Sequence, residues 1–218
     1  MIARGKTRLT EIASAMKIEA SKVSVYLNRL EKNFEFIERR LPFFAKPESN
    51  LGRYYLKDIT LTFWFRYVYP NFSYIEAGAK EVVIKQIISD FSTYQGFIIE
   101  PMVQQMLIQE WDQGRLPLKG MPQFGRYWGK EAEIDIVVHD EKNKQLFLGE
   151  VKLNKKRVNK SLLVDFKQKA AKVKEFKHYK EIRFGVITLE KLSHEQQKLL
   201  KKQGFWFMSL EDWANNTR

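Results

Sequence analysis

Two apolar runs that carry a few charged residues constrain the fold of this chain more than any other feature. Residues 133–139 (EIDIVVH) and 145–152 (QLFLGEVK) alternate in character and are rich in β-branched or aromatic side chains. Residues 140–144 (DEKNK) have the composition of a turn. The pattern predicts an antiparallel β-hairpin, and a turn centred between Lys142 and Asn143 sets its register.

That register would bring charged side chains of both strands onto one face of a sheet. Asp135 is expected opposite Glu150, and Glu133 opposite Lys152, while the next pair on the same face, Val137 and Leu148, is apolar. Paired carboxylates in such a place are costly unless a cation or solvent compensates their charge. Carboxylate oxygens are the ligands that Mg²⁺ or Mn²⁺ prefers, so the hairpin predicts a metal site that has room for a phosphate.

Composition narrows the class of protein. With 218 residues the chain is long enough for one domain of moderate size and a smaller one. It has no cysteine, which excludes disulfides and thiolate zinc sites, and its three histidines lack metal-ligand spacing. The N-terminus has no apolar signal core, and the richest apolar run, residues 59–69, is short and contains Arg66. We expect a cytoplasmic protein without a membrane role.

The positive charge is concentrated in two segments. The net charge is +12: residues 152–180 carry +9, residues 1–40 carry +4, and the remaining residues sum to −1. Clustering of this kind favours a phosphate backbone, and DNA is the predicted partner; the alternative is the solvated helix faces of a lysine-rich protein. The candidate DNA contacts that follow the second strand are Lys155, Lys156, Arg157, Lys160 and, on the next helix, Lys169.

Residues 7–44 have the pattern of a winged helix-turn-helix. A short periodic segment is followed by a break near residues 17–20 and by a second helix that is expected to open with Ser21 as its N-cap. Val23, Tyr26 and Leu27 belong to its predicted apolar stripe. The side chains predicted to contact DNA are Lys22, Ser24, Asn28 and Arg29 on this helix and Arg39 and Arg40 on the wing. Winged helices also dock proteins, and that alternative stays open.

The next segment, residues 52–71, is crowded with aromatic residues. Asp58 is suited to cap a helix and Pro70 to end it. The aromatic side chains are expected in the core, with a stacking platform for unpaired bases as the alternative. We treat residues 1–45 as the winged module, 46–95 as a helical connector and 96–218 as the main domain.

The main domain is predicted to be an α+β or α/β fold with a mixed sheet flanked by helices. Pro101 fits only the first turn of a helix, so Glu100 is expected at a helix N-terminus or on the loop before it. The expected order is a helix at 97–110, strands at 122–128, 133–139 and 145–152, a helix at 162–177, a strand at 182–188, a helix at 193–203, a strand at 205–209 and a last short helix.

The spacing of Asp135 and Glu150-Val-Lys152 resembles the D...ExK signature of the PD-(D/E)XK nucleases. The resemblance implies a restriction-endonuclease-like αβββαβ core and Mg²⁺-dependent hydrolysis of DNA. Asp135 and Glu150 would be metal ligands, Lys152 would orient water or the phosphate, and Glu100 would be an auxiliary ligand. Glu133 would be a further ligand or the ion-pair partner of Lys152.

A broader resemblance covers about residues 2–170. The runs RYYLKDITLTFWFRYVYPN, GFIIEPMVQQML, FGRYWGKEAEIDIVVHD and LGEVKLNKKRV, in that order, look like the C-terminal region of a family of archaeal and bacterial AAA-type P-loop ATPases. The ATPase module itself is absent from this chain, so ATP hydrolysis is not expected in it. A P-loop ATPase in cis or in trans is an implied partner. The alternatives to a nuclease are a catalytically inactive DNA-binding module of an ATPase and a protein-interaction domain.

Overall fold

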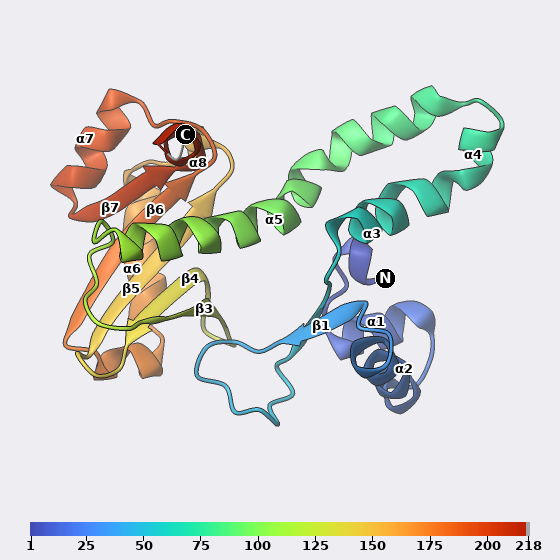
Figure 1. Ribbon diagram of the computed structural model, residues 1–218, viewed down its shortest axis with the longest axis horizontal. Helices are drawn as coiled ribbons and strands as arrows, with labels where there is room; N and C mark the ends of the chain where they lie inside the picture. The colour runs from blue at the N-terminus through green and yellow to red at the C-terminus, as the bar shows by residue number, and fades with distance from the viewer. Residues whose placement is uncertain (217–218) are drawn as a thin grey trace. The chain divides into compact units, whose positions relative to one another are not determined.

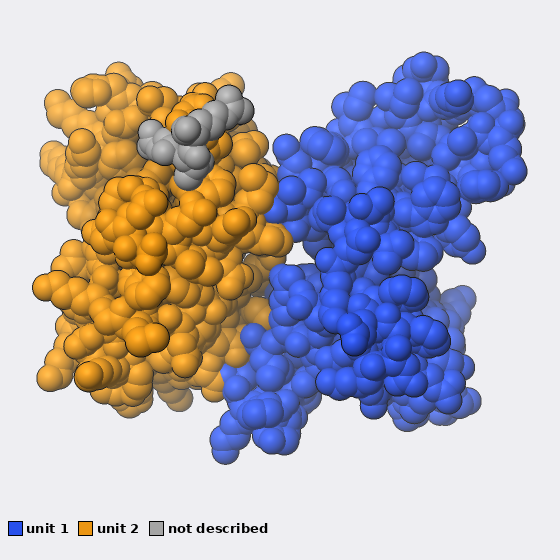
Figure 2. Space-filling model, in the orientation of Figure 1, with its two compact units in different colours: residues 1–41, 45–98 blue, residues 42–44, 99–218 orange. Residues whose placement is uncertain are grey.

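The structure is a computed structural model that describes residues 1–216, and it divides into two compact units (Figure 2). Unit 1 consists of Met1–Leu41 and Ala45–Ile98, and unit 2 consists of Pro42–Phe44 and the chain from Ile99 onward. The separation of residues 1–45 from 46–95 stays a prediction. Among residues 1–216, no helix combines the length and the hydropathy needed to cross a bilayer.

Unit 1 is mainly helical, with one two-stranded antiparallel sheet (Figure 1). Its elements are η1 (Ile2–Arg4), α1 (Leu9–Met16), α2 (Ala20–Lys32), β1 (Ile37–Arg40), β2 (Arg53–Leu56), α3 (Ile59–Phe63), the π-helical η2 (Trp64–Val68), η3 (Tyr69–Asn71), α4 (Phe72–Glu76) and the first part of α5 (Lys80–Asp112).

The first helices and the hairpin of unit 1 share one small core, which includes Val23 and Leu27 of α2 and Ile37 of β1. The helix α2 begins at Ala20 with Glu19 in the N-cap position, so the predicted N-cap at Ser21 is wrong. Tyr26 was expected beside Val23 and Leu27 but is 52% exposed. At about 100° of rotation per residue, Tyr26 lies at the edge of the stripe that Val23 and Leu27 form, where its ring stays in contact with solvent.

The aromatic segment of unit 1 is only partly buried. The Asp58 side chain accepts a hydrogen bond from the N–H of Thr60 at 2.6 Å, so the predicted cap of α3 is confirmed. Tyr67 is buried against the rings of Phe63 and Tyr94. The expectation that all aromatic side chains of this segment lie in the core is wrong, because only one side of α3 and η2 packs against α5. The exposed members are Trp64, Phe65 and Tyr69.

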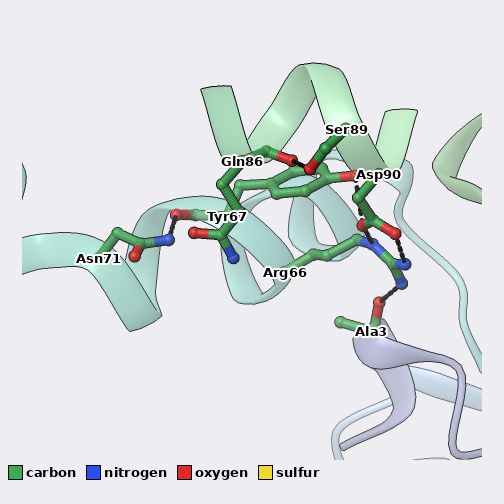
Figure 3. A network of polar contacts seen from close by, with 7 residues as sticks. All are labelled: Ala3, Arg66, Tyr67, Asn71, Gln86, Ser89 and Asp90. Carbon is green, nitrogen blue, oxygen red and sulfur yellow. Dashed lines mark hydrogen bonds and ion pairs between the residues drawn. The ribbon is translucent and has the colours of Figure 1, made fainter. Parts of the chain in front are cut away.

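A buried arginine ties three parts of unit 1 together (Figure 3). The guanidinium of Arg66 forms a two-pronged ion pair with Asp90 on α5 and donates to the carbonyl of Ala3 in η1 at 2.7 Å. The hydroxyl of Tyr67 donates to the same carboxylate at 2.8 Å. The hydrogen bond from Arg66 is the main cause that lowers the pKa of Asp90. Since the Arg66 side chain is 8% exposed, its charge depends on this partner.

We predict that Asp90→Ala lowers the free energy of unfolding of unit 1 by about 2–3 kcal/mol, because it leaves a buried guanidinium without its carboxylate. Urea denaturation measures the effect. Glu81→Ala, an exposed change on the same helix, is the matched control and should stay within about 0.5 kcal/mol of the unchanged protein. Equal stability of the two variants would contradict this account of Arg66.

The helix α5 runs without a break through Pro101, so the expectation that a helix starts beside this proline is wrong. Pro101 has no N–H to donate to the carbonyl of Phe97, which removes one hydrogen bond from the helix. Apolar residues on both sides of it are buried, including Tyr94, Ile99 and Val103, and their packing outweighs that loss. Glu100 therefore lies inside a helix.

Unit 2 is a five-stranded mixed sheet covered by helices on both faces, as predicted (Figure 1). Its elements after α5 are β3 (Gln123–Trp128), β4 (Glu133–Asp140), β5 (Gln145–Lys152), η4 (Lys155–Arg157), α6 (Lys160–Ala171), η5 (Lys174–His178), β6 (Glu181–Thr188), α7 (His194–Lys202), β7 (Phe205–Ser209) and α8 (Leu210–Asn216).

The strands of unit 2 lie in the order β3-β4-β5-β6-β7. The pairs β3–β4 and β4–β5 are antiparallel, and β5–β6 and β6–β7 are parallel, with α6 and α7 as the connecting helices. Residues of α6 and α7 pack on one face of the sheet, in what we call core A. Residues of the second half of α5 and of α8 pack on the other face, in core B.

The predicted hairpin register is confirmed over most of its length. Ile136 pairs with Gly149, Val137 with Leu148 and Asp140 with Gln145. The register continues from β5 into β6, where Glu150 pairs with Val186 and Lys152 with Thr188. Both carboxylate-bearing strands are therefore central strands of the sheet, fixed by neighbours on each side.

An aromatic group covers the turn end of this hairpin. The rings of Phe43 and Phe44 pack edge-on against His139, and the His139 Nδ1 atom lies 2.6 Å from the hydroxyl of Tyr179. Burial lowers the pKa of His139, while the charges of Glu141 and Asp140 raise it by less. The neutral imidazole is therefore the form that the fold prefers.

We predict that the stability of unit 2 falls as the pH drops below about 6.5, the value expected for an unfolded histidine. Above that pH the ring is neutral in both states, and below it the unfolded chain binds the proton first, which favours unfolding. Thermal melts between pH 7.5 and pH 5.5, values chosen about one unit to either side of it, should show a steeper loss for the unchanged protein than for His139→Gln. If the melting temperatures of both proteins fell equally with pH, protonation of His139 would not be the cause of the loss of stability.

Candidate functional site

The strand β4 contains a bulge at Asp135. Gly125 of β3 pairs with Val137, but Tyr127 pairs with Ile134, so the register shifts by one residue between them. Asp135 and Ile136 on β4 consequently face the single residue Arg126 on β3. A bulge of this kind bends the strand and re-aims the side chains next to it.

The bulge changes which face of the sheet each side chain occupies. Ile134 and Val137 both pack in core A although they are three residues apart. Alternation then places Glu133 on the opposite face. Leu148 also packs in core A, and regular alternation along β5 keeps Lys152 on that face. The prediction that Glu133 and Lys152 lie together on one face is therefore wrong.

Glu100, Arg126 and Glu133 form what we call the arginine cluster. The Nη1 atom of Arg126 forms an ion pair with Glu100 of α5. Its Nη2 atom lies 3.5 Å from Oε1 of Glu133 and 3.8 Å from Oδ1 of Asp135. The Arg126 side chain is 20% exposed, so its charge is partly screened from solvent by the protein. Glu133 thus pairs with an arginine of the neighbouring strand rather than with Lys152.

Glu150, Lys152 and Lys169 form the lysine cluster. The Nζ atom of Lys152 lies 2.7 Å from Oε1 of Glu150, and Nζ of Lys169, on α6, lies 3.8 Å from Oε2. The Glu150 side chain is 8% exposed. Its Oε2 atom is buried and accepts no hydrogen bond from residues 1–216. A buried carboxylate oxygen with spare lone pairs is suited to a cation.

Asp135 interacts with both clusters. Its Oδ2 atom accepts a hydrogen bond from the N–H of Val151 at 3.0 Å, beyond the last regular pair of β4 and β5. Burial is the main cause that raises the pKa of Asp135, and the charge of Glu150 raises it further. The Val151 hydrogen bond, Arg126 and Lys152 act in the opposite direction. A positive ion placed between Asp135 and Glu150 would relieve their repulsion.

The four predicted metal ligands do not meet at one point. Within the part of the chain that the structure describes, no group of three or more histidine, aspartate or glutamate side chains is placed to hold a metal ion. Glu100 and Glu133 contact Arg126 instead. Asp135 and Glu150 are the two carboxylates whose charges act on each other across the hairpin.

The predicted DNA contacts differ in how they are held. The α2 side chains Lys22, Ser24, Asn28 and Arg29 are all exposed, as are Lys156, Arg157 and Lys160 in unit 2. Lys155 forms an ion pair with Glu190 at 2.9 Å. In the hairpin of unit 1, Arg39 donates to the carbonyls of Pro47 and Ser49, and Arg40 pairs with Glu38.

Arg126 is the residue of this site that sequence reasoning missed. Its segment, Gly125-Arg126-Tyr127, was expected to be a strand, but the strand was not paired with β4 in advance. A short turn at residues 129–132, closed by the hydrogen bond from Gly129 N–H to the Ala132 carbonyl at 2.9 Å, makes the two strands neighbours. The short turn at residues 129–132 is thus the local signal that predicts Arg126 close to Asp135.

Comparison with known proteins gives three similarities. A family model, DUF234, described as archaea bacterial proteins of unknown function, matches residues 64–162. An uncharacterized protein of Methanocaldococcus jannaschii is 36% identical over 151 residues, which are 69% of this chain and 34% of that protein. The matched part of the chain thus spans about a third of the length of this curated relative.

Among solved structures, the crystal structure of a repair endonuclease from Pyrococcus abyssi aligns with 48% of this chain and 45% of that chain, at 19% identity and a TM-score of 0.34. The stretch that the DUF234 model matches contains Asp135, the whole arginine cluster and two of the three members of the lysine cluster, Glu150 and Lys152. This chain is therefore similar to the DUF234 proteins over the segment that carries its candidate site.

Proposed function

We propose that the protein is a metal-dependent nuclease that hydrolyses phosphodiester bonds in DNA. The observation that carries the proposal is the buried carboxylate of Glu150, which lies between Lys152 and Lys169 and beside Asp135. Two carboxylates and two ammonium groups in one partly buried place suit a divalent cation together with a phosphate.

The donor set fits Mg²⁺ or Mn²⁺. Asp135 and Glu150 supply hard oxygen ligands, and the buried Oε2 atom of Glu150 accepts no hydrogen bond within the described part of the chain. When bound, the metal would act as a Lewis acid toward the phosphate and would lower the pKa of water. Glu100 and Glu133, predicted as further ligands, pair with Arg126 and would support the site through that arginine rather than bind the metal.

The lysines would act on the substrate directly. Lys152, fixed by Glu150 at 2.7 Å, would hold a non-bridging phosphate oxygen or orient the attacking water. Lys169 comes from α6 to the same carboxylate and would be a further phosphate contact. Because the ammonium group of Lys152 is already hydrogen-bonded to Glu150, it would need little reorganisation when charge develops on the phosphate.

The DNA backbone would pass beside this centre. The residues after β5 turn directly into η4 and the start of α6, where Lys156, Arg157 and Lys160 are exposed. Such contacts position a duplex without reading its sequence. In unit 1 the exposed polar face of α2 would add a winged-helix contact, which would target the nuclease to DNA.

We predict that Mg²⁺ or Mn²⁺ supports cleavage of labelled single-stranded, duplex or branched DNA, and that Asp135→Asn and Lys152→Ala each lower the rate by about a hundredfold or more. Glu195→Gln, an exposed carboxylate change on α7, is the control and should cleave normally. Circular dichroism checks that each variant is folded. If the unchanged protein does not cleave DNA, or if Asp135→Asn and Lys152→Ala both still cleave it, the proposed nuclease centre is wrong.

A separate prediction concerns the basic segment. Joint replacement of Lys156, Arg157 and Lys160 by glutamine should reduce the slope of log affinity against log salt by about 0.9 for each lost phosphate contact. The same loss of charge on α7, at Lys198, Lys201 and Lys202, is the matched control. Fluorescence anisotropy with a labelled duplex measures the slope for each variant. If the two variants have the same slope, DNA does not bind preferentially at Lys156, Arg157 and Lys160.

A second candidate function is a nuclease-like module that binds DNA without cleaving it, in cis or in trans to a P-loop ATPase. The observation that favours it is Arg126, whose positive charge already lies among Glu100, Glu133 and Asp135. The fact that the matched part spans 34% of its relative leaves room for a further module in a longer protein of this kind. Tight DNA binding without metal-dependent cleavage would support this candidate.

A further inference from the structure

Arg126 lies beside the oxygen of Asp135 that is best placed to bind a divalent cation. The Oδ2 atom of Asp135 already accepts the N–H of Val151 at 3.0 Å, so Oδ1 is the oxygen with more capacity left for a metal. That oxygen is the one that faces Nη2 of Arg126, at 3.8 Å. A cation bound to Asp135 would thus lie next to a guanidinium, and the two positive charges would repel each other.

The protein fixes Arg126 in this place by its fold. The β4 bulge sets Arg126 opposite Asp135 and Ile136, and the ion pairs with Glu100 and Glu133 hold its guanidinium from α5 and β4. The N–H of Phe43 donates to the Arg126 carbonyl at 2.6 Å, which anchors the backbone of this residue as well. Arg126 is therefore not a surface side chain that reaches the carboxylates by chance.

We propose that Arg126 is an internal counter-cation that competes with the divalent metal for Asp135 and so sets the metal affinity of the site. This inference rests on the proposed function. In the metal-free protein Arg126 offsets the charge of three carboxylates. For metal to bind, the guanidinium gives up Asp135 while keeping Glu100 and Glu133, whose carboxylates can hold it after that exchange.

The experiment is calorimetric titration of the full chain, freed of metal by chelation, with MnCl₂. Arg126→Gln should bind Mn²⁺ about tenfold or more tightly than the unchanged protein, because it removes the competing charge. Arg183→Gln, which removes an arginine from an ion pair with Glu181 on β6, is the matched control and should leave the affinity unchanged. Thermal melts check the folding of each variant, and Mn²⁺ should raise the melting temperature of Arg126→Gln the most.

Affinity for Mn²⁺ that is equal or weaker in Arg126→Gln, while the unchanged protein binds the metal, would overturn the role of Arg126 and leave the proposed nuclease standing. If neither protein binds Mn²⁺ at millimolar concentrations, the role of Arg126 and the proposed metal-dependent nuclease are both overturned. Tight binding by Arg126→Gln alone would support the role of Arg126 and count against metal-dependent activity of the unchanged protein.

A second measurement keeps the inference testable if Arg126→Gln does not fold. In the unchanged protein the side-chain Nε–Hε signal of Arg126, assigned by its loss in Arg126→Lys, should shift when Mg²⁺ is added, as the guanidinium leaves Asp135. The signal of Arg183 should not move. No shift of the Arg126 signal at Mg²⁺ concentrations that saturate binding would overturn the competition.

Discussion

The pairing of β4 with β3 is the constraint on which the candidate site depends. If β4 were regular, Glu133, Asp135 and Glu150 would lie on one face of a sheet whose interior is otherwise apolar, and three carboxylates there would be costly. The bulge opposite Arg126 divides this charge between the two faces. Glu133 then has an arginine partner and Glu150 has two lysines, so each carboxylate lies beside a cation.

The sequence was a good guide wherever the determining interactions are local. The hairpin register from Ile136 to Asp140 follows from the alternation of the two strands and from one turn. The cap at Asp58 is equally local, because its carboxylate accepts the N–H of Thr60 only two residues further along the chain. The positions of the strands were predicted for the same reason, whereas the helix predicted at 162–177 is divided into α6, which ends at Ala171, and η5. The bulge could not be predicted from β4 alone, because it is defined by a partner strand that approaches from outside the hairpin.

Long-range packing accounts for the other errors. Pro101 has the local properties of a helix start, but buried residues before and after it keep α5 continuous. The aromatic side chains of α3 and η2 have similar hydropathy, and only their position relative to α5 decides that Tyr67 is buried while Trp64 is exposed. The Arg66–Asp90 pair joins residues 24 apart in the chain, a spacing that no local pattern indicates.

The segment Pro42–Phe44 belongs to unit 2, although the chain on either side of it belongs to unit 1. Phe43 lies so close to Gly125 that any side chain there would meet its ring, and its N–H is bonded to the carbonyl of Arg126. Neither unit is therefore a continuous stretch of sequence. A fragment that starts at Ile99 would lack the residues that cover β3 and support Arg126, so this protein does not lend itself to dissection into separately expressed domains.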